Sequence, residues 1–127
     1  MSSYGKLDPA DRRANTQQAA PTGQGDIVLD AVLDRLDAVQ PTGLFLTAAE
    51  LASVRRALVE RAEFGLKKYG TELRVLNGRC ATFDLYQELL DGIMYAMQAR
   101  MEGKPGGYMV ELLIGLAGQI EGQFENT

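Results

Sequence analysis

Histidine and tryptophan are absent from this sequence of 127 residues, and cysteine occurs once, at position 80. Without histidine, the chain lacks the commonest general base and the commonest ligand for transition metals. Cys80 alone can form neither an intrachain disulfide nor a structural zinc site, and as a nucleophile it would have no histidine partner. Any catalysis or metal binding must therefore depend on carboxylates.

Long apolar runs are also absent, and acidic residues outnumber basic ones. No run reaches the roughly 20 residues needed to span a bilayer, and the opening MSSYGKLDPADRR has no apolar signal core. A net charge of −4 and an isoelectric point near 4.8 argue against binding to nucleic acid or to an anionic membrane. We therefore expect a cytoplasmic protein that binds neither.

The remaining composition is typical of one folded domain. Hydrophobic residues make up 46% of the chain and charged residues 24%, which is enough for a core. Residues 1–25 are polar and lack periodicity, so we interpret them as a flexible N-terminal arm, or alternatively as a strap on a partner subunit. Residues 26–127 are expected to form a helical domain.

Apolar residues recur every three or four positions after residue 26, which indicates amphipathic helices. Thr47 and Glu50 match a capping box, Gly70 suits a left-handed C-terminal cap, and Thr82 or Asp84 could begin the third helix. We predict an all-α, four-helix bundle-like fold that is oligomeric. The expected helices lie near residues 27–39, 48–69, 83–101 and 108–124.

Two of these helices carry apolar stripes that should form the core. The stripes are Leu85, Leu89, Ile93, Met97 and Met101 on the third helix, and Met109, Leu113, Leu116, Ile120 and Phe124 on the fourth. The other side of the fourth helix carries Gly115, Gly118 and Gly122. Each glycine costs roughly 1 kcal/mol relative to alanine inside a helix. We therefore expect a second helix backbone to approach this side in a homodimer or higher homo-oligomer.

Two acidic pairs, Glu60 with Glu63 and Glu88 with Asp91, could each direct two carboxylates to one side of a helix. Four such carboxylates suit a hard divalent cation such as Mg²⁺. The second pair also lies on a continuous acidic stripe that ends at Tyr95. The simpler interpretation is that both pairs are solvated faces of a bundle.

Basic and amide groups lie near these acids in the sequence, namely Arg61, Lys68, Asn77 and Arg79. A cation held by carboxylates, with lysine and arginine at its margin, is what a polyphosphate substrate requires. We therefore predict that these four residues and Tyr95 bind the substrate.

The chain resembles the MazG-like all-α NTP pyrophosphohydrolases, and in particular the small members found in bacteriophages. The resemblance depends on the two acidic pairs, the run R-x-x-x-G-x-x-K-Y-G, the tripeptide N-G-R and the run D-x-x-x-E-x-x-D-x-x-x-Y. It implies Mg²⁺-dependent cleavage of a nucleoside triphosphate to monophosphate and pyrophosphate, in the host cytoplasm if a phage encodes the protein. It also implies that Mg²⁺ is held by Glu60, Glu63, Glu88 and Asp91, with Glu63 and Glu88 as catalytic residues.

Two alternatives remain open at this level. The chain could be a nucleotide-binding module that keeps the basic residues without the reaction. It could also be a helical oligomerisation or interaction protein of a phage, with no small-molecule site. The sequence does not distinguish among nucleobases or between ribose and deoxyribose.

Overall fold

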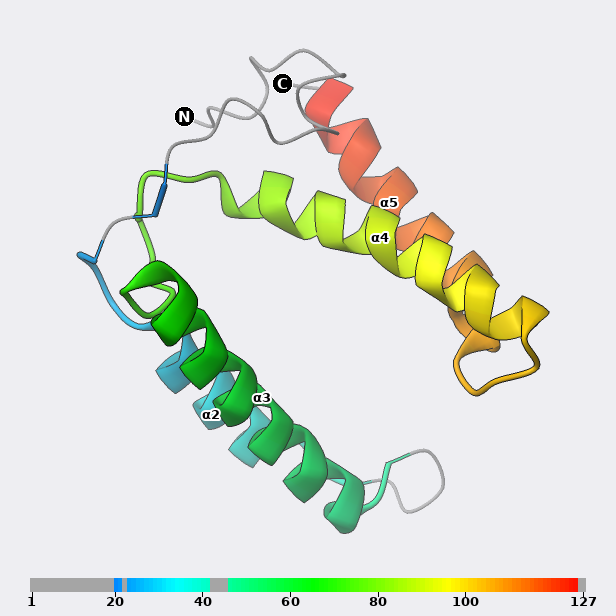
Figure 1. Ribbon diagram of the computed structural model, residues 1–127, viewed down its shortest axis with the longest axis horizontal. Coiled ribbons are helices and arrows are strands. Elements are labelled where there is room, and N and C mark those ends of the chain that lie inside the picture. The colour runs from blue at the N-terminus through cyan, green and yellow to red at the C-terminus, as the bar shows by residue number, and fades with distance from the viewer. Residues whose placement is uncertain (1–19, 22, 42–45, 126–127) are drawn as a thin grey trace. The chain divides into compact units, whose positions relative to one another are not determined.

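The computed structural model describes residues 20–21, 23–41 and 46–125, and the predicted N-terminal arm lies almost entirely outside them. The described chain is all-α, as predicted, and contains no β-strand (Figure 1). Each predicted helix exists, and its bounds are within two residues of those expected. In chain order the elements are α2 (Val28–Ala38), α3 (Ala48–Tyr69), α4 (Ala81–Met101), the short 3₁₀ helix η2 (Gly107–Met109) and α5 (Val110–Glu125).

The helices belong to two compact units. Residues 19–78 form one unit, which holds α2 and α3, and residues 79–127 belong to the other, which holds α4, η2 and α5. Within each unit two helices pack side by side, α2 on α3 and α4 on α5 (Figure 1). We call these the α2–α3 unit and the α4–α5 unit.

The ends of α3 are fixed by local side-chain and backbone chemistry. The Glu50 backbone N–H donates to the Thr47 hydroxyl at 3.1 Å, and the Thr47 N–H donates to the Glu50 carboxylate at 2.8 Å. This is the predicted capping box, which satisfies two amides that have no partner inside the helix. Gly70 ends α3 with a φ of 76°, which a residue without a Cβ adopts readily.

Apolar residues on the side of α3 that meets α2 are covered unevenly. Leu51, Leu58 and Ala62 are half-buried, whereas Val54 and Tyr69 are exposed. Because α2 has 11 residues and α3 has 22, α2 covers only part of the length of α3.

A short backbone pairing closes the α2–α3 unit. The Val28 N–H donates to the Leu73 carbonyl at 2.8 Å, and the Val75 N–H donates to the Asp26 carbonyl at 2.9 Å. A Cβ added at Gly25 would lie 2.2 Å from the Val75 carbonyl oxygen, so only glycine allows this approach. The loop after α3 therefore pairs with the segment before α2 rather than folding into a hairpin on itself.

The core of the α4–α5 unit is formed around Phe83, which is fully buried. Tyr86 and Phe124 meet edge to face, with ring centroids 5.5 Å apart and ring planes at 89°. Ala117 completes the buried cluster. Leu89, Ile93 and Ile120, three members of the predicted stripes, pack against it.

The predicted stripe on α4 is wrong at Leu85, Met97 and Met101, which are 52%, 39% and 81% exposed. Its members are spaced by four residues, and each such step rotates about 40° around the helix, so its ends lie about 160° apart. Only the middle of the stripe can face α5. The buried side instead follows alternating steps of three and four, from Phe83 through Tyr86 and Leu90 to Ile93. In the predicted stripe on the fourth helix, Leu116 on α5 and Met109 in η2 are likewise exposed rather than buried.

The start of α4 also differs from the prediction, because Cys80 is the N-cap rather than Thr82 or Asp84. The Phe83 N–H donates to the Cys80 sulfur at 3.4 Å. Asp84 lies one turn inside the helix and accepts hydrogen bonds from Arg79 instead.

Candidate functional site

The first acidic pair, Glu60 and Glu63, is exposed on α3. Both residues lie on the side of the helix opposite Leu58, which is half-buried on the side that meets α2. Glu60 also borders a shallow hollow whose other lining residues are Arg55, Arg56 and Val59. Both carboxylates are therefore accessible to a ligand, with guanidinium groups one turn away.

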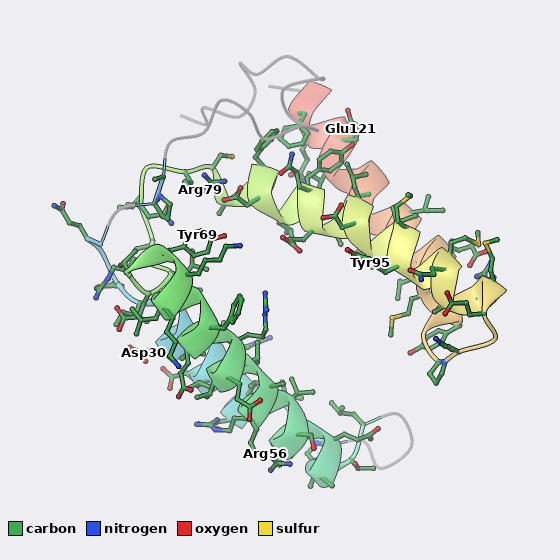
Figure 2. All side chains as sticks on the ribbon, viewed as in Figure 1. Asp30, Arg56, Tyr69, Arg79, Tyr95 and Glu121 are labelled. Carbon is green, nitrogen blue, oxygen red and sulfur yellow. The ribbon has the colours of Figure 1, made fainter. Side chains whose placement is uncertain are left out.

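The second pair, Glu88 and Asp91, is exposed on α4, on the side of the helix away from the core. Tyr95 continues the same stripe and is 69% exposed (Figure 2). The helix thus brings these three side chains together, as the sequence predicted. Because like charges three residues apart repel one another, a bound cation would stabilise this arrangement.

Arg79 was predicted to bind substrate, and the structure shows it bound to Asp84. Its Nε and Nη2 donate to the two carboxylate oxygens at 2.9 and 2.7 Å, and its side chain is largely buried. This bidentate pair connects the loop to the first turn of α4. A phosphate would compete with Asp84 for the Nε and Nη2 donors of Arg79.

Asn77, the other predicted donor from the loop, is buried with 7% of its surface exposed. Its neighbour Leu76 has a positive φ of 53°, which is unusual for a residue with a branched side chain. The position of Asn77 makes its side chain part of the packing of the loop. A ligand at the surface would not reach it in this conformation.

The predicted basic residues of α3 are both next to aromatic rings. The Arg61 guanidinium carbon lies 5.1 Å from the centroid of the Phe64 ring, and the Lys68 ammonium lies 5.2 Å from that of Tyr69. Both rings are more than half exposed, and Figure 2 shows Tyr69 at the end of α3. Phe64 was not among the predicted site residues, although its offsets of three from Arg61 and four from Lys68 place all three on one side of the helix. We call Arg61, Phe64 and Lys68 the cation–aromatic stripe.

The four acids do not form one cluster within either unit. Glu60 and Glu63 belong to the α2–α3 unit, whereas Glu88 and Asp91 belong to the α4–α5 unit. In the part of each unit that the structure describes, no three carboxylates or thiols lie close enough to hold one metal ion. Each pair offers only oxygen donors, the type that Mg²⁺ prefers, but two carboxylates form only part of a site.

Comparison with known proteins found no family model, no curated protein and no solved structure that matches the chain. None of the helices that the structure describes is long and apolar enough to cross a membrane.

Proposed function

We propose that the chain is a Mg²⁺-dependent nucleoside triphosphate pyrophosphohydrolase, which releases a monophosphate and pyrophosphate. One observation carries this proposal: both acidic pairs are exposed on the sides of α3 and α4 that face away from the helix packed against each. Core packing therefore leaves all four carboxylates available for a ligand. The resemblance in the sequence to MazG-like enzymes involves the same four residues.

In this proposal Glu60, Glu63, Glu88 and Asp91 are the carboxylates that bind Mg²⁺. When bound, Mg²⁺ would neutralise much of the triphosphate charge and orient the phosphates. Glu63 or Glu88 would accept the proton of the attacking water. Arg61 and Lys68 would bind the remaining phosphate charge. The predicted substrate contacts of Asn77, Arg79 and Tyr95 remain part of this proposal, although the first would require the loop to open.

Hydrolysis of a panel of ribonucleoside and deoxyribonucleoside triphosphates, with and without Mg²⁺, tests the proposal. Chromatography of the products should show equal amounts of monophosphate and pyrophosphate. Glu88→Gln and Asp91→Asn should each reduce the rate by about 100-fold or more, as is usual when a group that stabilises the transition state is removed. Asp34→Asn, which removes an exposed carboxylate on α2, is the matched control and should retain the wild-type rate.

Two results would contradict the proposal: a wild-type protein that hydrolyses none of these triphosphates, or full activity in Glu88→Gln and Asp91→Asn. Binding without turnover would instead support a second candidate, a nucleotide-binding module. The cation–aromatic stripe favours this candidate specifically, because it does not depend on the carboxylates.

A further inference from the structure

Phe64 lies in an unusual environment for a phenylalanine. It is 55% exposed in the middle of the outer surface of α3, where a polar residue would be expected. Its ring does not belong to the buried core cluster of the α4–α5 unit. Among the described residues, the guanidinium of Arg61 lies over the ring, 5.1 Å from its centroid.

The two cations of the stripe are also not used in ion pairs. No described carboxylate lies within ion-pair distance of Arg61 or Lys68, whereas Arg55, Arg74 and Arg100 are each paired with an acid. Arg61 lies one turn before Phe64, and Lys68 lies one turn after it. The stripe therefore presents an exposed aromatic ring between two positive charges that are available to a ligand.

We infer that Phe64 stacks against the base of a nucleotide while Arg61 and Lys68 bind its phosphates. Any nucleobase can stack on an exposed aromatic side chain, because every base has a flat π-face. A guanidinium on one face of the ring leaves the other face for a base. Guanidinium and ammonium groups bind phosphate oxygens through charge-assisted hydrogen bonds. The stripe combines both kinds of contact on one side of one helix.

The inference rests on the proposed function, and it identifies the residue that holds the base. Glu60 lies one turn before Phe64, so a nucleotide stacked there would carry its phosphates close to a carboxylate expected to hold Mg²⁺. The net charge of −4 disfavours a long polyanion and favours a single nucleotide complexed with a divalent cation.

Binding measurements on the full-length chain can separate the contribution of the base from that of the phosphates. Ca²⁺ replaces Mg²⁺ in these measurements to suppress turnover. The probes are ATP and inorganic tripolyphosphate, measured by isothermal titration calorimetry. Phe64→Leu keeps the apolar volume and removes the ring, so it should weaken ATP binding by roughly 5- to 100-fold while leaving tripolyphosphate binding unchanged. Phe64→Tyr should restore ATP binding. Arg61→Gln and Lys68→Gln should each weaken the binding of both ATP and tripolyphosphate.

Leu66→Ala, which truncates an exposed side chain on another side of α3, is the matched control and should bind like the wild type. Circular dichroism and light scattering on each variant establish that its helices and its assembly are intact. A Phe64→Leu protein that changes its oligomeric state would contradict the inference and assign Phe64 to a contact between copies. A single-stranded oligonucleotide that binds more tightly than ATP would contradict the choice of a mononucleotide.

The inference and the proposed function can fail separately. Wild-type affinity for ATP in Phe64→Leu, together with normal hydrolysis, would overturn the inference and leave the hydrolase proposal intact. A selective loss of ATP binding in Phe64→Leu, from a wild type that hydrolyses nothing, would support the inference and overturn the hydrolase proposal. A wild type that binds no nucleotide would overturn both.

Discussion

Arg100 near the end of α4 and Glu111 at the start of α5 form a bidentate ion pair, with Nη1 2.9 Å from Oε1 and Nη2 2.6 Å from Oε2. Arg100 also donates from Nε to the Gly107 carbonyl at 3.0 Å. One guanidinium thus connects both ends of the turn between the two helices. The hydrogen bonds from Arg100 lower the pKa of Glu111 from its usual 4.5 to about 2.

The stability of the α4–α5 unit should consequently fall in acid. Above pH 4.5, Glu111 is ionised in both the folded and the unfolded chain, and the pair contributes fully. As the pH falls toward 2, the unfolded chain takes up the proton first, so folding becomes less favourable. Urea unfolding at pH 5, 4, 3 and 2.5 should show a smaller decline for Glu111→Gln than for the wild type. Glu88→Gln is the control at an exposed carboxylate that pairs with no described cation. Equal declines in all three proteins would contradict the assignment.

Alanine should have opposite effects at two glycines of this unit. A Cβ at Gly107 would lie 2.7 Å from the Arg100 Cα, and the backbone would have to move, so Gly107→Ala should destabilise the fold by roughly 1–3 kcal/mol. A Cβ at Gly115 would meet no atom of the described chain within 4 Å. In the isolated chain, Gly115→Ala should therefore stabilise the helix by up to about 1 kcal/mol. Thermal or urea unfolding measures both variants at a protein concentration that keeps the chain monomeric, and a destabilising Gly115→Ala there would contradict the prediction.

The glycine side of α5 should also determine assembly. No atom of the described residues lies within 4 Å of a Cβ added at Gly115, Gly118 or Gly122, so nothing in that part of the chain requires glycine there. We expect a homodimer in which a second backbone occupies this space. Static light scattering should show a dimer for the wild type and a loss of mass for Gly118→Leu. Gln123→Leu places the same leucine side chain at an exposed position on another side of α5 and should remain dimeric. A wild-type monomer at micromolar concentration would contradict the expectation.

The ends of α3 could be predicted from the sequence because their chemistry is local. Thr47 and Glu50 satisfy each other's backbone amides across three residues, without help from the rest of the chain. The start of α4 was predicted wrongly because a thiol is a weaker acceptor than a hydroxyl or a carboxylate. There, the burial of Phe83 and the pairing of Asp84 with Arg79 accompany a helix that begins two residues earlier than predicted.

The candidate site was also predictable where its arrangement depends only on local spacing in the sequence. Periodicity alone places Glu88, Asp91 and Tyr95 on one side of α4, and the structure has them there. The sequence could not reveal that Arg79 is paired or that Asn77 is buried, since both depend on how the loop packs. Phe64 was missed because a sequence does not show whether an aromatic side chain is buried in a core or exposed. Only its exposed fraction in the structure indicates another role.

The pairing between the segment before α2 and the loop after α3 also determines the order of events when the chain folds. Arg74 Nη1 donates to the Gly25 carbonyl across 49 positions of sequence, and the bonds of Val28 and Val75 lie beside it. Closing so long a loop costs entropy, whereas α2 and α3 can form from contacts within a few residues. The pairing should therefore form after the helices and break before them. The amide protons of Val28 and Val75 should accordingly exchange with solvent through a local opening, while the middle of α3 stays protected.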